Sequence, residues 1–290
     1  MSSPFKRPAV LVGAAVAALA VAGAIAFAVI SSRPADAPTP TPAPPTPATS
    51  VTPAEAAAPF DFRSETPYAS VELTLPQALK PYPDLHARLF AAGVRDLRQF
   101  TEGSQSDRTE AGGDIGVGPY EKTIELDTPV ETGKLLSLAR TDYEFTGGAH
   151  GMSSFSGVLW DKALKRDLAP TDLFRQGADL SALDAALCAA LNAEKKERDP
   201  AAAPLTVAAA DGTMWSCPRA TVVPFVLAAG STPGKAGGLT FMVGPYIVGP
   251  YVEGSFWVNV PQSAFRDLIT PAYVDDFAGD PTPLPEVDGR

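Results

Sequence analysis

Apolar and polar side chains alternate along several short stretches of this chain, which is the pattern of strands with one buried face. Residues 68–75 place Val71, Leu73 and Leu75 on one side. Six further stretches show the same kind of pattern: residues 120–126, 135–145, 152–160, 221–227, 238–243 and 251–260. The three between residues 120 and 160 follow one another closely, so we predict that they are successive antiparallel strands.

Two longer stretches have the spacing of amphipathic helices. The first begins at Pro83 and runs to about Thr101, and the second covers residues 178–198. Their apolar stripes are Leu85, Leu89, Val94, Leu97 and Phe100 in the first, and Leu180, Leu183, Leu187 and Leu191 in the second. His86 falls on the first turn of the first helix, where we expect it to face solvent or to cap the helix.

Shorter helical turns are predicted near Thr171, as a capping residue, and over residues 261–268, where a proline suits the first turn. Together these elements predict an α+β fold of two adjoining subdomains, residues 60–165 and 166–274, each with a helix packed on antiparallel strands. Residues 275–290 are acidic and rich in proline, so we expect a flexible tail.

An uncharged apolar run covers residues 9–30. As a helix it would be about 33 Å long, enough to cross a bilayer. The basic residues precede it, so residues 1–8 are expected in the cytoplasm and the rest outside. Cleavage after Ala37 is the alternative, but Pro38 is poorly suited to follow a cut. We therefore predict a single-pass protein of a bacterial cytoplasmic membrane with an extracytoplasmic C-terminal domain.

Residues 31–59 are dominated by proline, alanine and threonine and contain no aromatic side chain. Such a segment cannot bury a core, so we expect a disordered, extended spacer between the membrane and the globular part. Beyond Pro59 the chain has 20 basic and 31 acidic residues, a formal net charge of −11. This balance speaks against nucleic acid as a partner and would suit a basic one.

The only two cysteines, Cys188 and Cys217, lie in the part expected outside the cell, where a disulfide persists. A bridge between them is predicted, and two buried thiols are the alternative. Together with His86 and His150 they show no spacing of a metal site, so we predict no metal and no cofactor.

A run of glycines around a histidine separates two of the predicted strands. Gly147 and Gly148 can take the positive φ angles of a tight turn, and they let another backbone or a ligand approach closely, so they are candidates for ligand contact. His150 follows them. His150 either holds this turn by hydrogen bonds to the backbone or contacts a ligand. If the protein is an enzyme, His150 would work with Asp142 and Glu144, which share one face of the preceding strand.

A second distinctive stretch combines aromatic residues with glycine and proline. Tyr246, Tyr251 and Trp257 lie in or near the Gly/Pro-rich residues 244–254, where aromatic faces serve either strand packing or ligand binding. We find no nucleophile elbow, phosphate-binding loop, dinucleotide fingerprint or zinc-protease motif. Our leading interpretation is therefore that the protein is not an enzyme, and under it we predict no catalytic residue.

Three segments resemble one known family. Residues 145–151, Phe-Thr-Gly-Gly-Ala-His-Gly, resemble the Tyr-Thr-Gly-Gly-Ala-His-Gly signature of the extracytoplasmic domain pair of the anti-sigma factor RsiV and the peptidoglycan deacetylase PdaC. Residues 168–174 resemble its "L-x-x-x-D-L-F" segment, and residues 238–254 its "G-L-T-F … P-Y-x-x-G-P-Y-x-x-G" block. The resemblance spans residues 68–268 and implies two adjoining α+β subdomains outside the membrane.

The resemblance also implies a class of function. In RsiV-like proteins this domain recognises lysozyme, whereas PdaC-like proteins add a separate deacetylase domain. We expect this chain to be a non-enzymatic, membrane-tethered envelope protein that binds a lysozyme-like muramidase or peptidoglycan. The alternatives are a small hydrolase or deacetylase acting on wall glycan through His150, and a purely structural envelope protein.

Overall fold

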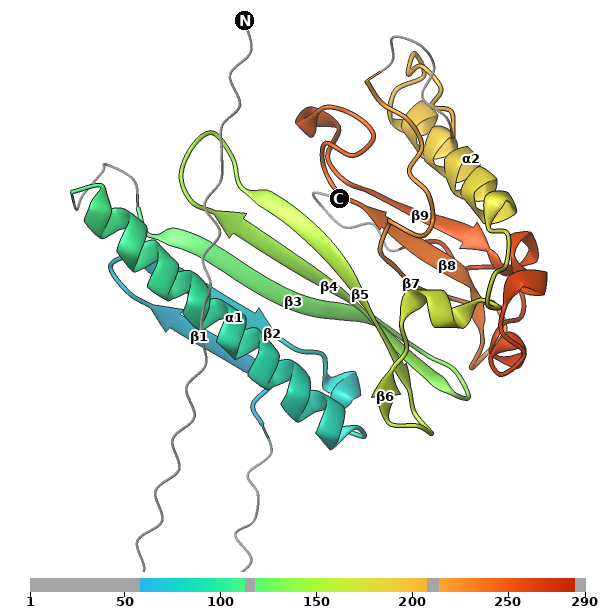
Figure 1. Ribbon diagram of the computed structural model, residues 1–290, viewed down its shortest axis with the longest axis horizontal. Helices are drawn as coiled ribbons and strands as arrows, with labels where there is room; N and C mark the ends of the chain where they lie inside the picture. The colour runs from blue at the N-terminus through green and yellow to red at the C-terminus, as the bar shows by residue number, and fades with distance from the viewer. Residues whose placement is uncertain (1–57, 113–117, 208–213, 285–290) are drawn as a thin grey trace, which may run out of the picture. The chain divides into compact units, whose positions relative to one another are not determined.

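The computed structural model describes residues 58–112, 118–207 and 214–284, all within one compact unit (Figure 1). The predicted membrane segment, and the predicted linker up to residue 57, lie outside the described residues. Within the described ranges, no helix combines the length and the apolar character that crossing a membrane requires. The fold is α+β, as predicted, with two separate sheets.

The first sheet has six strands in the order β1-β2-β3-β4-β5-β6. They are β1 Asp61–Glu65, β2 Ala69–Thr74, β3 Tyr120–Glu131, β4 Leu135–Phe145, β5 Met152–Asp161 and β6 Arg166–Asp167. Neighbours are antiparallel except β2 and β3, which run parallel. The prediction of antiparallel strands is therefore wrong at this pair, because helix α1 between them is a crossover that returns the chain to the same direction.

Helix α1, Pro83–Glu110, covers one face of this sheet (Figure 1). It extends nine residues beyond the predicted end at Thr101. Leu85 and Leu97 are fully buried against the alternating apolar side of β2 and β3. Gly93 allows the close approach, because a Cβ there would lie 2.8 Å from Leu73 Cδ1.

The second sheet has three antiparallel strands in the order β7-β8-β9. They are β7 Phe225–Ala229, β8 Ala236–Val243 and β9 Phe256–Pro261, and helix α2, Ser181–Arg198, packs on one face (Figure 1). The predicted strand 251–260 begins only at Phe256, since Tyr251–Glu253 forms a 3-10 turn. The predicted helix 261–268 is instead two 3-10 turns, Gln262–Ala264 and Arg266–Leu268.

The two sheets pack against each other through the faces that the helices leave open. Ala139, Val226, Met242 and Trp257 form a small core between them, and β8 is buried along its whole length. The Ser137 hydroxyl accepts a hydrogen bond of 3.0 Å from the backbone N–H of β7 residue 227. At residue 157 of β5 any side chain would fall 2.1 Å from a carbonyl oxygen of β7, so the contact between the sheets requires glycine.

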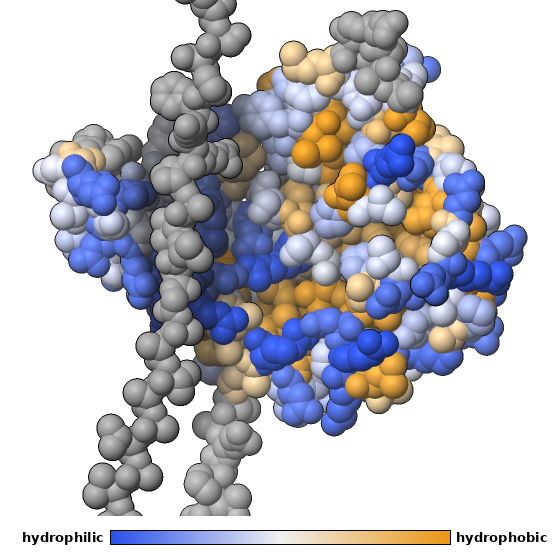
Figure 2. Space-filling view, viewed as in Figure 1, coloured by the Kyte–Doolittle hydropathy of each residue, from blue (hydrophilic) through white to orange (hydrophobic). Residues whose placement is uncertain are grey.

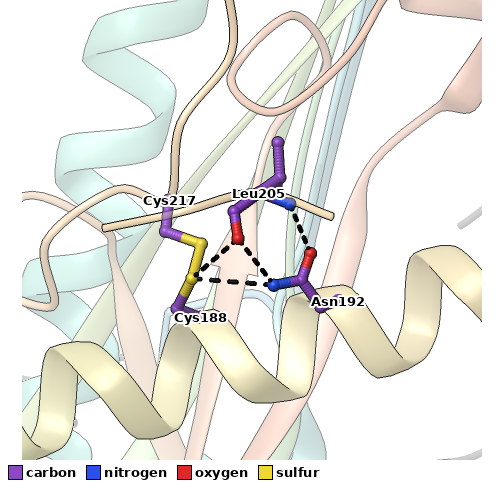
Figure 3. The surroundings of a disulfide bond; sticks show 4 residues. All are labelled: Cys188, Asn192, Leu205 and Cys217. Carbon is purple, nitrogen blue, oxygen red and sulfur yellow. Dashed lines mark hydrogen bonds between the residues drawn. A yellow bond between two sulfur atoms is a disulfide. The ribbon is translucent and has the colours of Figure 1, made fainter. Parts of the chain in front are cut away.

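The predicted disulfide is confirmed. Cys188 on α2 is bonded to Cys217 in the segment that leads to β7, with 5.3 Å between the Cα atoms (Figure 3). Beside it, the Asn192 side chain forms two hydrogen bonds with the backbone of Leu205, of 2.9 and 2.7 Å. A covalent bond and a pair of polar contacts thus attach the same segment to the helix.

Three smaller predictions are corrected. His86 is 4% exposed, with Nε2 donating to the Pro59 carbonyl at 3.0 Å and its ring stacked on Phe60, so it neither faces solvent nor caps the helix. Thr171 lies inside the short turn Pro170–Leu173, which has no side-chain cap. Residues 275–284 of the predicted flexible tail pack on the domain, because Phe277 is buried and the backbone of the following residues bonds the ends of β7 and β8. Residues 285–290 lie outside the described residues.

One buried polar pair joins the first sheet to the C-terminal segment. Tyr273 donates to the Asp161 carboxylate at 2.8 Å. Burial opposes the charge on Asp161, but hydrogen bonds from the Leu164 N–H, from Tyr273 and from the Ala163 N–H hold its pKa below the usual range. Burial and the same carboxylate raise the pKa of Tyr273 to about 12.

Candidate functional site

The turn between β4 and β5 is built from glycines at defined positions. Gly147 and Gly148 have φ angles of 94° and 97°, which side-chain-bearing residues rarely adopt. Gly151 is buried against the ring of Tyr143, and a Cβ at this position would lie 2.3 Å from the tyrosine hydroxyl. The backbone of this turn therefore favours glycine at residues 147 and 148, and Gly151 leaves room for the ring of Tyr143.

His150 projects from this turn and is exposed. Its Nδ1 lies 2.9 Å from the carbonyl oxygen of Gly151. Because a carbonyl oxygen only accepts, Nδ1 carries the proton in this contact, which leaves Nε2 as the acceptor in a neutral ring. Tyr246 Oη lies 3.5 Å from that Nε2. His150 thus makes the backbone contact that the sequence predicts, and it also faces a second segment of the chain.

Three of the predicted ligand candidates come together here. The rings of His150 and Tyr251 stack with centroids 3.6 Å apart, and the centroid of Tyr246 lies 5.5 Å from that of Tyr251. Tyr251 also donates a hydrogen bond of 2.8 Å to the Gly151 carbonyl. We call His150, Tyr246 and Tyr251 the aromatic cluster. It joins the end of the first sheet to the segment between β8 and β9.

Tyr246 is the most conspicuous member of the aromatic cluster. Its φ is 66°, a left-handed conformation that is strained for a bulky side chain, and 47% of its surface is exposed. An aromatic residue kept in a strained backbone conformation at the surface is a feature often found at ligand-contacting positions.

Trp257 does not join the aromatic cluster. It is 7% exposed and packs edge-on against Phe155, with 5.4 Å between ring centroids, in the core between the sheets. The expectation of a ligand contact at Trp257 is therefore corrected: alternation along β9 turns this side chain toward the first sheet.

The two carboxylates proposed to assist His150 are engaged elsewhere. Asp142 forms two hydrogen bonds of 2.7 Å with Arg140, whose pKa these bonds raise, and Arg140 also reaches Asp96 on α1 at 2.8 Å. Glu144 pairs with Lys122. Both carboxylates therefore point to the α1 side of the sheet, and the two polar contacts of His150 within the described ranges go to a carbonyl and a hydroxyl.

An apolar hollow of about 270 Å³ lies beside the aromatic cluster. Its lining comes from β5, from the residues before β7, from the end of β8 and from the start of the segment after β8. It includes Phe155, Val222, Pro224, Met242, Pro245 and Ile247. Val222 and Ile247 are 73% and 50% exposed at its edge. Neither Val222 nor Ile247 was predicted as a site residue, although Ile247 directly follows Tyr246 in the Gly/Pro-rich stretch.

The described residues contain no group of three or more His, Cys, Asp or Glu side chains arranged to hold a metal ion. The groups exposed around the glycine turn are the aromatic rings of Tyr246 and His150 and the aliphatic side chains of Val222 and Ile247.

Part of the chain matches a known protein family. Residues 62–153 match the family described as "Deacetylase PdaC". The matched part runs from β1 into the start of β5, so it contains α1, the glycine turn and His150. The first-sheet part of the chain is thus similar to a PdaC-type domain, which supports the resemblance in its broad form.

Two solved structures of DUF3298 family proteins are similar to this chain. One, from Pseudomonas aeruginosa PAO1, is 16% identical, with 77% of this chain and 99% of that chain covered and a TM-score of 0.47. The other, from Bacteroides fragilis NCTC 9343, is 17% identical, with 74% and 93% covered and a TM-score of 0.47. Comparison with curated proteins gives no match.

Proposed function

We propose that this chain is a non-enzymatic, membrane-tethered envelope protein whose extracytoplasmic domain binds a protein partner in the wall space. The partner class is a basic, lysozyme-like muramidase. One observation carries the proposal: His150 and Tyr246, 96 residues apart in sequence, form an exposed aromatic cluster that continues into an apolar rim.

The aromatic cluster and the rim have the composition of a protein-binding surface. Interface centres are enriched in aromatic and aliphatic side chains and depleted of charge. Tyr246 and Ile247 are about half exposed, and Val222 is more so. The hollow that Ile247 and Val222 help to line has room for one side chain of a partner. Figure 2 shows hydrophobic residues at the surface in several places over the part that holds the second sheet, whereas the surface over α1 is mostly hydrophilic.

The open face of the first sheet supports a basic partner. On β1, β2 and β3, every second side chain lies on the face of the sheet opposite α1. These side chains include six carboxylates and one cation, Arg63, which pairs with Glu72 at 2.6 Å. These acids are Asp61, Glu65, Glu72, Glu121, Glu125 and Asp127, so the face has a formal charge of −5. Such a face would accelerate encounter with a cationic protein at low salt.

A catalytic role for His150 is the second candidate, and the match to a family described as a deacetylase favours considering it. A general base is normally oriented by a further polar group such as a carboxylate. His150 Nδ1 is oriented by the Gly151 carbonyl, and the carboxylates of Asp142 and Glu144 bind cations on the other face of the sheet. This geometry favours binding over catalysis.

The test measures binding of the full-length chain, reconstituted in detergent, to a lysozyme-type muramidase and, separately, to soluble peptidoglycan fragments. We expect binding to the protein, a loss of about tenfold or more with Tyr246→Ala or Ile247→Glu, and weakening by added salt. Leu164→Glu is the matched control, because Leu164 is 59% exposed on the turn between β5 and β6.

Other outcomes identify the competing functions. Binding of glycan alone, abolished by Tyr246→Ala, would replace the protein partner with peptidoglycan. Wall-glycan hydrolysis or deacetylation that His150→Ala removes would establish the enzyme. Absence of binding and of activity would leave a structural envelope protein.

A further inference from the structure

The segment that carries the two tyrosines, residues 244–254 and here called the aromatic loop, is attached to α2 on the side away from His150. Lys195 lies in the last turn of the helix, with its side chain 8% exposed. Its Nζ donates a 2.8 Å hydrogen bond to the Val248 carbonyl and pairs with the Glu253 carboxylate. One buried ammonium therefore joins two points of the aromatic loop that are five residues apart.

Arg198, one helical turn further on, adds a second attachment. Its Nη1 donates to the backbone carbonyls of Glu253 at 3.0 Å and Ser255 at 2.9 Å. The guanidinium also lies 4.1 Å from the ring centre of Phe256, the first residue of β9. The two cations together fix the C-terminal end of the aromatic loop where it enters the second sheet.

The aromatic loop is folded tightly around the Glu253 carboxylate. A Cβ at residue 249 would lie 2.4 Å from Glu253 Oε2, so Gly249 makes room for the ion pair. Gly254, with a φ of 72°, reverses the chain directly after Glu253. Tyr251 opens the same 3-10 turn, Tyr251–Glu253, and its ring stacks on His150. The turn thus contacts α2 at one end and the aromatic cluster at the other.

We propose that Lys195, supported by Arg198, is a positioning residue for the aromatic cluster. Without its ammonium, a carboxylate and a carbonyl at this partly buried place would lose their partner, which favours rearrangement of the aromatic loop. The strained conformation of Tyr246 and the stacking of Tyr251 on His150 both depend on that loop. The inference rests on the proposed function only in assigning partner binding to the aromatic cluster.

The sequence marks Lys195 as unusual, because a charged residue occupies a position of an apolar stripe. Leu187 and Leu191 belong to the buried stripe of α2, and the next position of the stripe, four residues on, is Lys195. A buried lysine that continues an apolar stripe needs a partner of opposite charge. Glu253, 58 residues later, is that partner.

The test uses the full-length chain with isotope-labelled histidine. Because the chain has only two histidines, the spectrum has two imidazole signals, which His150→Ala assigns. In Lys195→Met we expect the ring-current shift of the His150 signal to be lost, the His86 signal to stay, and affinity for the muramidase to fall about tenfold or more. Lys196→Met is the matched control, since Lys196 is the next residue and is exposed.

Two further variants keep the test decisive. Lys195→Arg should retain the wild-type His150 signal and affinity, and Glu253→Gln should shift the His150 signal in the same direction as Lys195→Met. If Lys195→Met abolishes folding, these two variants decide the matter. An unchanged His150 signal in a folded Lys195→Met or Glu253→Gln protein would overturn the positioning role. If wild-type protein binds no muramidase, the proposed function fails, while the His150 signal still tests this inference.

Discussion

Removing the disulfide tests how this domain is stabilised. Cys188 and Cys217 are 29 residues apart, so cross-linking them restricts a loop of about 30 residues in the unfolded chain. The chain-entropy relation gives about 3.6 kcal/mol at 25 °C for a loop of that size. The contacts between Asn192 and Leu205 remain in the folded protein when both cysteines are replaced. We therefore expect a double Cys→Ala variant to keep its fold and lose roughly 3–4 kcal/mol of unfolding free energy.

The assay is urea unfolding of residues 54–290, the compact unit, with and without both substitutions. The midpoint should fall by about 1–4 M, given a slope of about 1–3 kcal/mol per molar urea. Asn192→Ala is an informative companion, since it removes the polar contacts and keeps the covalent bond. A loss below about 1 kcal/mol, or a variant that no longer folds at all, would refute the argument that the bond acts mainly on the unfolded chain.

Three further predictions concern single side chains. Gly148→Val should lower the melting temperature more than His150→Ala, because the valine adds about 1–3 kcal/mol of backbone strain, and calorimetry that ranks them the other way would contradict this. The folded-state pKa of Tyr273 is raised, so its contribution to the free energy of unfolding is present below about pH 10 and is lost as the pH rises to about 12. The pKa of Asp161 is lowered, so its contribution to the free energy of unfolding is present above about pH 4 and is lost in acid. Tyr273→Phe should therefore cost about 1.5–3 kcal/mol at pH 7 and flatten both limbs of the stability profile in urea. His86→Ala should cost about 1–3 kcal/mol, and hydrogen exchange at β1 should increase; no change would mean that the buried ring contributes nothing.

Local patterns predicted local structure well. The alternation of apolar and polar residues through β4 and β5, with glycines between them, is enough to predict a hairpin. The two strands that pair are neighbours in the sequence. The disulfide was predictable because the only two cysteines lie in the part expected outside the cell. The stripe of Leu183, Leu187 and Leu191 likewise predicted the buried side of α2.

Pairings between distant segments were not encoded in those patterns. The alternation along β2 predicts which of its side chains are buried, but it does not predict whether the neighbouring strand runs parallel or antiparallel. The direction of β3 relative to β2 depends on the packing of α1 on the sheet. The same limit applies to Trp257, since an aromatic residue beside glycines fits a surface and a core equally well. His86 was misjudged because its partner, the Pro59 carbonyl, belongs to the segment before β1.

The glycine turn shows how a site can be half predictable. Gly147, Gly148 and His150 mark the turn in the sequence, and nothing local links them to tyrosines about a hundred residues later. That link exists because the second sheet packs on β4 and β5 and brings the aromatic loop against Gly151, which accepts a hydrogen bond from Tyr251. Among the described residues, the second sheet covers β4 and β5 and leaves the acidic face of β1 to β3 exposed. The contact that assembles the aromatic cluster therefore also determines which charged surface remains open to a partner.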